Sequence, residues 1–567
     1  MALAVPPTTT LWHEPPELTP HEQAITDWPL LSAILQRRGI ATRAEAEHFL
    51  HPAEIPFGDP YLLPDMHHAV SMIRDAVESG APIGIFGDYD VDGISSTAML
   101  TRALRKLGAQ VMPRIPHRVN DGYGLNMGAV EAFAAAGAGL LITVDCGSSD
   151  VAQLARALEL GLQVIVLDHH RVHHELPEAV AFVSPKRASN AYVEVELAAG
   201  GVAFTLVRAL VGEQEAEMYL PYAALATIAD VVPLSGENRV IAARGLEVLR
   251  RWSLPGFKTL CKVAGIDRRA VDAFDIGYVV GPRINAAGRM ETPDIALDWF
   301  LADDVAASLP HAQKLDRLNR QRQADTRQVL QEAELQLRLQ EGGYEQPALV
   351  VSGREWNAGV IGIVAGRLAE RFNRPAVVIS RGPQLSTGSA RTAGEVDISE
   401  AIRACGDLLE RFGGHTAAAG MTLESSRIDA FRDALNSAVF DQLGGTLPAA
   451  EIFLDAAVEH AELDLTTVDR LGVLEPCGHG NDRPLLLARG LYAENVRTSR
   501  DGRHLLFNAI DSRGRRHQAT FFGAGDRREQ LASCGMIDIA AELMRNSWKG
   551  RVSLQLRLAD FRPGAGS

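Results

Sequence analysis

Three short apolar runs in the first half of the chain each lead directly into acidic or histidine side chains, and no other pattern constrains the fold as much. The runs are PIGIFG at 82–87, followed by Asp88, Asp90 and Asp92; GLLITV at 139–144, followed by Asp145; and QVIVL at 163–167, followed by Asp168, His169 and His170. Continuous apolar runs alternating with Ala- and Leu-rich helical patterns indicate a parallel sheet covered by helices on both faces. Because ligands bind beyond the carboxyl ends of such strands, these side chains should share one edge of the sheet.

Carboxylates at this spacing repel one another unless a cation neutralises them. A lone Asp-x-Asp is more often a solvated turn, but here three strand ends converge, and a further acid, Asp230, interrupts the apolar segment ATIADVV. Oxygen donors mixed with imidazole nitrogen suit a pair of Mn²⁺ or Mg²⁺ ions. The sequence therefore predicts a metal site built from Asp90, Asp92, Asp145, His169 and Asp230.

The 567 residues are too many for one hydrophobic core, so we expect several domains. A proline-rich lead-in with two short helical patterns covers 1–65, and the α/β catalytic lobe follows at 66–305. A glycine-free helical pattern at 306–341 predicts a connecting helix of about 45 Å, which two glycines end. A second α/β lobe is expected at 342–445, and closely spaced short strands at 446–567 predict a small β-barrel or sandwich.

The charge of the chain is divided unevenly. The net charge is −15, yet residues 483–567 hold 15 Lys and Arg against 8 Asp and Glu. A basic tail fits a module that grips phosphates, and a mixed surface is the alternative. No apolar run is long enough for a membrane span, no secretion signal begins the sequence, and the five cysteines form no Cys-x-x-Cys pair. We expect a cytoplasmic monomer with reduced thiols.

The acidic motifs match a known family in order and context. Asp-Tyr-Asp-x-Asp-Gly from residue 88, Val-Asp-Cys-Gly from 144, Asp-His-His at 168–170 and Ala-Asp at 229–230 resemble the four motifs of the Asp-His-His (DHH) phosphoesterases. Within that family the chain most resembles the RecJ-type exonucleases, through segments such as NDGYGLN at 120–126, GPRINAAGRM at 281–290 and FGGHTAAAG at 412–420. The resemblance implies a DHH lobe, a long helix, a DHHA1-like second lobe and a C-terminal OB-fold.

The resemblance also implies an activity and roles for the acidic residues. It implies exonuclease action on single-stranded DNA from the 5′ end, releasing 5′ mononucleotides in DNA repair and recombination. One ion would bind Asp90 and Asp145, with Asp88 close by, and the other would bind Asp92, Asp145, His169 and Asp230. His170 would face the scissile phosphate, so the catalytic groups are Asp88, Asp145 and His170. A helicase and a single-strand-binding protein are the candidate protein partners.

Further residues are candidates for binding DNA or phosphate. We expect GPRINAAGRM to form a loop carrying Arg283, Asn285 and Arg289 toward the backbone, with a plain surface turn as the alternative. In the second lobe, Gly413, Gly414 and His415 precede a predicted helix of small residues whose N-terminus would cradle an anion, completed by Ser389 and Arg391. In the tail, Trp548 lies among basic residues and would stack on bases.

Three positions depart from the RecJ-type pattern. Asn357 replaces the histidine of Trp-His-x-Gly, Asp482 replaces the proline of Gly-Asn-Pro, and Leu506 stands where a lysine is frequent. Asn357 can form hydrogen bonds but cannot carry charge. Two alternatives stay open: a DHH phosphodiesterase acting on short oligonucleotides or cyclic dinucleotides, which would not need the basic tail, and a catalytically inactive DNA clamp, which would not need the complete set of acids.

Overall fold

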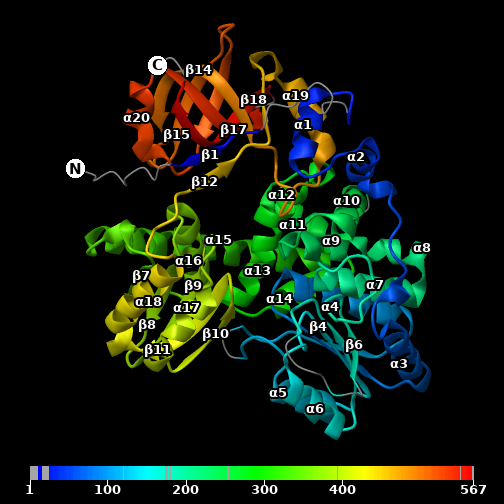
Figure 1. Cartoon of the computed structure of the whole chain (residues 1–567). Helices are drawn as coiled ribbons and strands as arrows, with labels where there is room; N and C mark the ends of the chain where they lie inside the picture. The colour runs from blue at the N-terminus through cyan, green and yellow to red at the C-terminus, as the bar shows by residue number, and fades with distance from the viewer. Residues whose placement is uncertain are drawn as a thin grey trace.

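The computed structural model describes residues 10–15, 25–118, 121–172, 177, 180–251, 254–392, 394–548 and 551–564. The catalytic lobe and the second lobe lie side by side, the long helix α15 (Val305–Leu339) links them, and the C-terminal barrel lies above both (Figure 1). This arrangement confirms the predicted fold class. None of the helices in these ranges is long and apolar enough to cross a membrane.

The catalytic lobe is built on a five-stranded sheet whose order is β3-β2-β4-β5-β6, with every pairing parallel. The strands are β2 (Ile83–Gly87), β3 (Val111–Arg114), β4 (Leu140–Val144), β5 (Gln163–Leu167) and β6 (Val180–Val183). Along each strand, successive residues point to opposite faces of the sheet and pack in two separate hydrophobic cores. One face packs on α3 (Met66–Ser79), α4 (Val91–Lys106), α7 (Ala199–Val211) and α9 (Leu220–Ala229), the other on α5 (Met127–Ala135) and α6 (Val151–Glu159).

A set of helices completes this lobe and leads out of it: α10 (Gly236–Arg251), α11 (Pro255–Ala264), α12 (Ala273–Asp275), the π-helical turn η5 (Ile276–Val280), α13 (Gly281–Met290) and α14 (Asp294–Leu301). The segment GPRINAAGRM is thus helix α13, and the prediction of a loop there was wrong. The helix α15 begins where Asp304 caps the backbone N–H of Ala307. Leu315 lies in the core of the catalytic lobe and Leu337 in that of the second lobe, which explains how one helix joins both.

The second lobe contains a mixed sheet of order β10-β11-β9-β8-β7. Its strands are β7 (Leu349–Arg354), β8 (Ala376–Arg381), β9 (Leu385–Arg391), β10 (Arg411–His415) and β11 (Ala418–Glu424), and its helices are α16 (Ala358–Phe372), α17 (Ile398–Ala404) and α18 (Ile428–Gln442). The helix predicted after His415 is therefore wrong, because those residues form strand β11. Small residues suit this hairpin since a Cβ on Gly414 would lie 2.4 Å from the carbonyl oxygen of Ala418.

The C-terminal domain is a five-stranded barrel, which confirms the expected OB-fold. It is formed by β14 (Leu486–Thr498), β15 (Leu505–Ile510), β16 (Arg516–Phe521), β18 (Arg551–Pro563) and β17 (Met536–Trp548), and β17 closes the barrel on β14. Up to Leu50, the described part of the lead-in belongs to the same domain, whereas Phe57 and Leu63 pack in the core of the catalytic lobe. Helix α1 (Pro29–Arg37) buries Ile34 and Leu35 in the barrel core, α2 (Arg43–Leu50) follows it, and β1 (Leu11–His13) pairs with β12 (Glu451–Phe453). The lead-in is more ordered than its prolines indicated.

Candidate metal centre and phosphate cleft

Strand β2 delivers the first acidic residues into a tightly packed turn. A Cβ on Gly87 would lie 2.0 Å from the hydroxyl oxygen of Thr97, and one on Gly93 would lie 2.4 Å from the backbone nitrogen of Asp88. Only glycine permits α4 to start this close to the strand. Asp90 caps α4 by accepting a hydrogen bond from the N–H of Gly93 at 3.1 Å. Asp88 and Asp90 thus lie at the carboxyl edge of the sheet, as predicted.

Asp92 lies in the first turn of α4 and is fully buried. Its carboxylate accepts hydrogen bonds from the N–H groups of Ala199 at 2.8 Å and Gly200 at 2.7 Å, at the start of α7. Burial raises the pKa of Asp92 to about 7, and the charge of Asp90 adds to that effect. The two N–H donors orient a carboxylate that the surroundings would otherwise leave protonated.

Asp145 follows β4 with a left-handed backbone at φ 64°, a conformation that aspartate tolerates better than most residues. Its carbonyl oxygen accepts a hydrogen bond from the hydroxyl of Tyr123 at 3.2 Å. Burial, together with the charges of Asp92 and Asp90, raises the pKa of the Asp145 carboxyl well above its usual range. The strand end therefore presents a buried carboxylate in the middle of the acidic cluster.

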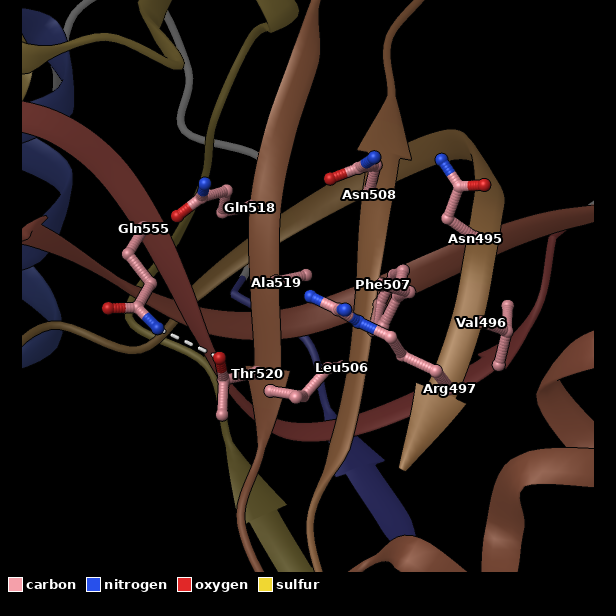
Figure 2. A pocket seen from close by; sticks show the side chains of 10 residues that line it. All are labelled: Asn495, Val496, Arg497, Leu506, Phe507, Asn508, Gln518, Ala519, Thr520 and Gln555. Carbon is pink, nitrogen blue, oxygen red and sulfur yellow. Dashed lines mark hydrogen bonds between the residues drawn. The ribbon is translucent and has the colours of Figure 1, made fainter. Parts of the chain in front are cut away.

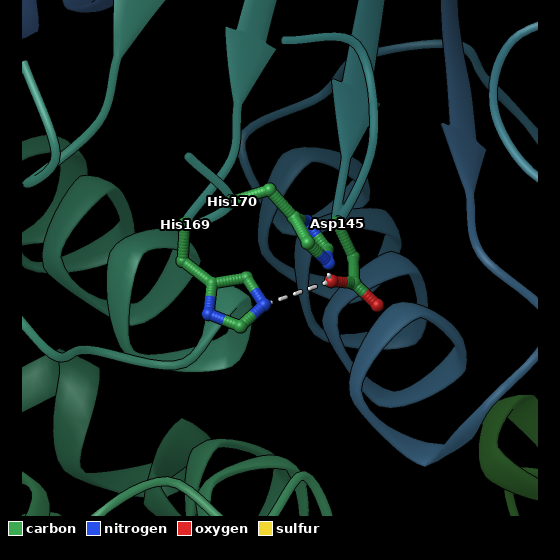
Figure 3. Close-up of side chains that lie close together, drawn as sticks. All are labelled: Asp145, His169 and His170. Carbon is green, nitrogen blue, oxygen red and sulfur yellow. Dashed lines mark ion pairs between the residues drawn. The ribbon is translucent and has the colours of Figure 1, made fainter. Parts of the chain in front are cut away.

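The two histidines after β5 point at Asp145 from one side, as Figure 3 shows. Nε2 of His169 lies 3.3 Å from an Asp145 carboxylate oxygen, and Nδ1 of His170 lies 4.0 Å from it. Asp168 fixes the pair, because its carboxylate accepts the backbone N–H groups of both histidines at 2.8 and 3.1 Å and contacts Nδ1 of His170 at 2.7 Å.

The surroundings shift the pKa values of His169 and His170 in opposite directions. Burial, and then the charge of His170, lowers the pKa of His169 to about 4, so its imidazole is neutral and free to bind a metal. Burial of His170 acts in the same sense, but its hydrogen bond with Asp168 and the charges of Asp168, Asp92 and Asp88 together outweigh burial and raise the pKa of His170. The sequence motif thus contains one neutral and one readily protonated imidazole.

Asp230 caps the C-terminal end of α9 and completes the cluster. Its carboxylate lies 3.7 Å from Nε2 of His169. Burial and the charges of Asp92 and Asp90 raise the pKa of Asp230 to about 9. All five predicted ligands therefore meet at one edge of the sheet.

The donor set fits a divalent cation. Three groups bring their ligand atoms within 4.8 Å of one another: Asp88, Asp90 and Asp145; Asp92, His169 and Asp230; and Asp145, His169 and His170. Among the described residues, Nε2 of His169 and Oδ1 of Asp88 are buried and form no hydrogen bond. Buried carboxylates with raised pKa values and unpaired donor atoms are what a hard cation would satisfy.

Beside the acids, a cluster of guanidinium groups lies where the two lobes meet, at a place called the cleft below. Burial and the charges of Arg118, Arg322 and Arg391 lower the pKa of Arg289 to about 9. Within the ranges that the structure describes, Arg118, Arg289 and Arg391 contact an aromatic ring, a hydroxyl and backbone carbonyls but make no ion pair with a carboxylate. Guanidinium groups held this close together without an acidic partner would suit an anion.

The predicted residues of α13 separate into different roles. Arg289 lies in the cleft, where Nη1 donates to the carbonyl of Gly359 at 3.3 Å. Arg283 points away from it and pairs with Asp316 of α15 at 3.0 Å. The side-chain oxygen of Asn285 accepts the N–H of Val91 at 3.1 Å, so Asn285 supports the acidic turn rather than facing a ligand.

The second lobe contributes the other wall of the cleft. Ser389 and Arg391 lie on β9, and Nη1 of Arg391 contacts the Ser389 hydroxyl at 3.2 Å. His415 and Arg391 both pair with Ala418 in the sheet, so they occupy one rung. Burial and the charges of Arg391 and His170 lower the pKa of His415. Gly414 lies in the hairpin of β10 and β11, so this described segment does not form the helix N-terminus that was predicted to bind an anion.

Asn357 has a structural role at the same wall. Its side-chain oxygen caps α16 by accepting the N–H of Gly359 at 2.9 Å, and its amide donates to Asp325 at 3.3 Å. An uncharged residue performs both functions.

The barrel carries a groove of about 660 Å³ on the face formed by β14, β15, β16 and β18. Figure 2 shows Arg497 and four amide side chains on this face, those of Asn495, Asn508, Gln518 and Gln555. Leu506 also lines it, at one of the positions that depart from the family pattern. The side chain of Trp548, at the end of β17, lies outside the described part of the chain.

Sequence reasoning missed Arg118, Arg322 and Tyr123 as members of the cleft. Tyr123 lies in the segment NDGYGLN, and its hydroxyl contacts Nδ1 of His170 at 3.2 Å. Arg118 stacks on the ring of Tyr89 at 4.7 Å. The segment NDGYGLN was a usable signal for Tyr123, whereas isolated arginines in a surface helix and a loop gave none.

Comparisons with known proteins agree with this geometry. The model of the DHH family, N-terminal domain, matches residues 82–230, that of the DHHA1 domain matches 345–440, and that of the RecJ OB domain matches 454–560. The single-stranded-DNA-specific exonuclease RecJ of Bacillus subtilis is 37% identical over 94% of this chain and 68% of its own length. The protein of the same name from Salmonella typhimurium is 31% identical over 94% of this chain and 96% of its own.

Solved structures extend the similarity to three dimensions. The crystal structure of RecJ in complex with Mn²⁺ from Thermus thermophilus superimposes with a TM-score of 0.83 at 30% identity, covering 98% of this chain and 80% of that one. The corresponding Mg²⁺ complex has a TM-score of 0.76 at 29% identity and covers 98% and 79%.

Proposed function

This chain belongs to the RecJ family of single-stranded-DNA-specific exonucleases, and on that premise we propose that it digests single strands from the 5′ end with two divalent ions. The family makes the chain a phosphodiesterase hydrolase. The direction, the number of ions and the roles of individual residues are the content of the proposal. The observation that carries it is the unpaired arginine cluster beside the acidic centre.

The acidic residues divide between two ion sites. Asp88, Asp90 and Asp145 would hold one ion, and Asp92, Asp145, His169 and Asp230 the other, so Asp145 would be shared. Two such ions would supply an activated water and Lewis-acid stabilisation of the phosphoryl oxygens. Mn²⁺ and Mg²⁺ are the ions proposed, because hard oxygen donors predominate. Asp168 keeps both histidines in place through its backbone hydrogen bonds.

The arginine cluster supports a 5′ direction. A terminal phosphate monoester carries up to two negative charges near neutral pH, whereas an internal diester carries one. Arg289 and Arg391 therefore favour a strand whose end bears a phosphate, which in DNA is the 5′ end. Cleavage of the bond from phosphorus to the 3′ oxygen of the first nucleotide releases a 5′ mononucleotide. It leaves a new 5′ phosphate on the strand, so the same cleft can bind again.

His170 is the proposed proton donor. Its raised pKa keeps a proton on the imidazole at higher pH than usual, and Asp168 holds Nδ1. The departing 3′ oxygen needs a proton, which Nε2 of His170 can supply. The hydroxyl of Tyr123 also contacts this ring and limits its rotation.

The barrel groove supports the preference for long single strands. Its amides and Arg497 offer hydrogen bonds to bases and phosphates without specifying a sequence. A cytoplasmic location, a monomeric state and partnership with a helicase or a single-strand-binding protein stay predictions from the sequence.

The test uses single strands with a 3′ fluorophore and either a 5′ phosphate or a 5′ hydroxyl, incubated with Mn²⁺. We expect 5′ mononucleotides, faster digestion of the phosphorylated strand, and loss of that preference in Arg289→Ala and Arg391→Ala. Phe440→Ala, an exposed change on α18, serves as the control. Digestion from the 3′ end, or equal rates for both 5′ ends, would sink the proposed direction. Faster hydrolysis of dinucleotides than of long strands would instead favour a small-substrate phosphodiesterase.

A further inference from the structure

A second groove, of about 620 Å³, lies between the catalytic lobe and the barrel. One wall is the segment around Asp230, including Ala229 and Val231, and another is the turn formed by α12 and η5. The barrel side contributes Arg483 and Arg557. In Figure 1 the helix α12 lies at the top of the catalytic lobe, directly below the barrel. The groove therefore lies between the acidic centre and the barrel, the two parts of the enzyme that are proposed to bind the strand.

Two exposed aromatic side chains form a platform in this groove. Phe274 and Tyr278 are four residues apart on one helical turn, and their rings stack at 4.5 Å with an angle of 24°. Tyr278 is 72% exposed and Phe274 is 37% exposed. Large aromatic side chains that pack on each other rather than in a core mark an interaction site.

The arginines of the groove already have acidic partners. Arg483 pairs with Asp272 at 2.8 Å and with Glu475 at 3.2 Å, and Arg557 pairs with Glu542 of the barrel. Among the described residues that line the groove, neither guanidinium group is therefore free to bind a phosphate. A groove with paired arginines and an aromatic platform suits the faces of bases better than the phosphate backbone.

The groove begins one residue from a proposed metal ligand. Val231 follows Asp230 directly, is 61% exposed, and has a left-handed backbone at φ 62°. Such a conformation is strained for a β-branched residue and persists only where neighbours impose it. The barrel side fixes this segment, because the N–H of Leu234 donates to the carbonyl of His479 at 2.7 Å. The wall between acidic centre and groove is therefore held rigidly.

We propose that this groove is a base-stacking subsite, in which Tyr278 and Phe274 bind one base of the single strand between the acidic centre and the barrel. The inference rests on the proposed function, because the substrate must be a single strand that extends from the acidic centre. The stacked base belongs to a nucleotide a short distance from the scissile bond. An unpaired base can enter the groove, whereas a paired base cannot offer its face.

The experiment scans the strand with single abasic sites, one position at a time from the 5′ end, and measures affinity in EDTA so that no hydrolysis occurs. At one position we expect loss of the base to weaken binding to the unmodified enzyme by about 5- to 100-fold, as for removal of one base–aromatic stack. Tyr278→Ala should bind the intact strand that much more weakly and show no further loss at that position. Tyr278→Trp should retain the position effect, and Phe440→Ala is the matched control.

The outcomes separate the inference from the function on which it rests. The inference is overturned if Tyr278→Ala binds every strand as the unmodified enzyme does, or loses the same affinity at all abasic positions. If neither Tyr278→Ala nor Phe274→Ala alters DNA binding, the platform faces a protein and the inference is equally overturned. A position effect that tracks the 3′ end supports stacking while contradicting the 5′ direction. Tyr278→Ala should weaken the binding of long strands more than the binding of dinucleotides.

Discussion

Replacing Asp230 by asparagine should make the metal-free enzyme more stable while abolishing its activity. Asp230 has a raised pKa, about 9, because of burial and the charges of Asp92 and Asp90. Nε2 of His169 lies 3.7 Å from the Asp230 carboxylate, but His169 is held neutral by its own lowered pKa. Asparagine has the same shape as aspartate without the charge, so the substitution removes the repulsion and leaves the packing intact.

The sign and size follow from proton linkage. A carboxyl whose folded-state pKa is raised binds a proton that the unfolded chain has released, so stability falls as pH rises from about 4 to about 9. Holding Asp230 protonated at pH 7 costs about 1.4 kcal/mol for each pH unit above its ordinary value of 3.8, or about 4 kcal/mol at most. Because several carboxyls share the repulsion, we expect Asp230→Asn to gain about 2 to 4 kcal/mol at pH 7 and almost nothing at pH 4.

The assay is urea unfolding in EDTA at pH 4.5, 7 and 9, with exposed Asp433→Asn as control. Mn²⁺ should stabilise the unmodified enzyme more than Asp230→Asn, since binding requires the carboxylate. The reasoning fails if Asp230→Asn unfolds at the same or lower urea concentration at pH 9, or if its advantage does not grow with pH.

Three further predictions concern the same cleft. Asp168→Asn should reduce Mn²⁺ affinity or activity by about 10- to 100-fold, measured by Mn²⁺-titrated hydrolysis, and full activity at low Mn²⁺ would contradict it. Arg283→Ala should lose about 1 to 3 kcal/mol of stability, because the buried Asp316 then keeps only its ion pair with the exposed Arg320, yet it should keep its DNA affinity. Arg289→Ala should show the reverse in paired unfolding and binding assays. Val231→Gly should raise the unfolding free energy by up to about 1 kcal/mol. Relief of the left-handed strain contributes about 1 to 2 kcal/mol, which exceeds the entropic cost of glycine of about 0.5 to 1 kcal/mol. A lower melting temperature would refute this prediction.

The acidic centre could be predicted because its signal is local. Each of β2, β4 and β5 is a short apolar run, and the rule that polar ligands follow the carboxyl ends of parallel strands needs no knowledge of tertiary contacts. That His169 is neutral whereas His170 is readily protonated could not be predicted in this way. They depend on which ring Asp168 contacts, and that contact is a matter of side-chain geometry.

The roles of the arginines on α13 and the structure of the TAAAG segment could not be predicted from local sequence. Arg283 and Arg289 are six positions apart, and at 3.6 residues per turn they project from different sides of α13. When the segment was predicted to be a loop, both arginines were expected to bind the DNA backbone. Because the segment is a helix, Arg283 pairs with Asp316 of α15, whereas Arg289 lies in the cleft. The run TAAAG has the composition of a helix, but pairing with β9 makes it a strand. In both cases a neighbour distant in sequence decided the structure.

The enzyme contains an acidic and a basic cluster of side chains that lie close together. The carboxylates come from the catalytic lobe alone, whereas the guanidiniums come from both lobes, with Arg289 on α13 and Arg391 on β9. Repulsion between these two arginines therefore destabilises the folded enzyme, and a bound phosphate would reverse it. Cations at the acidic edge would likewise remove the repulsion among the carboxylates. Metal and DNA should consequently stabilise the folded enzyme through separate clusters. Because the scissile phosphate would contact both clusters in the proposed mode of binding, the two ligands should bind more tightly together than either does alone.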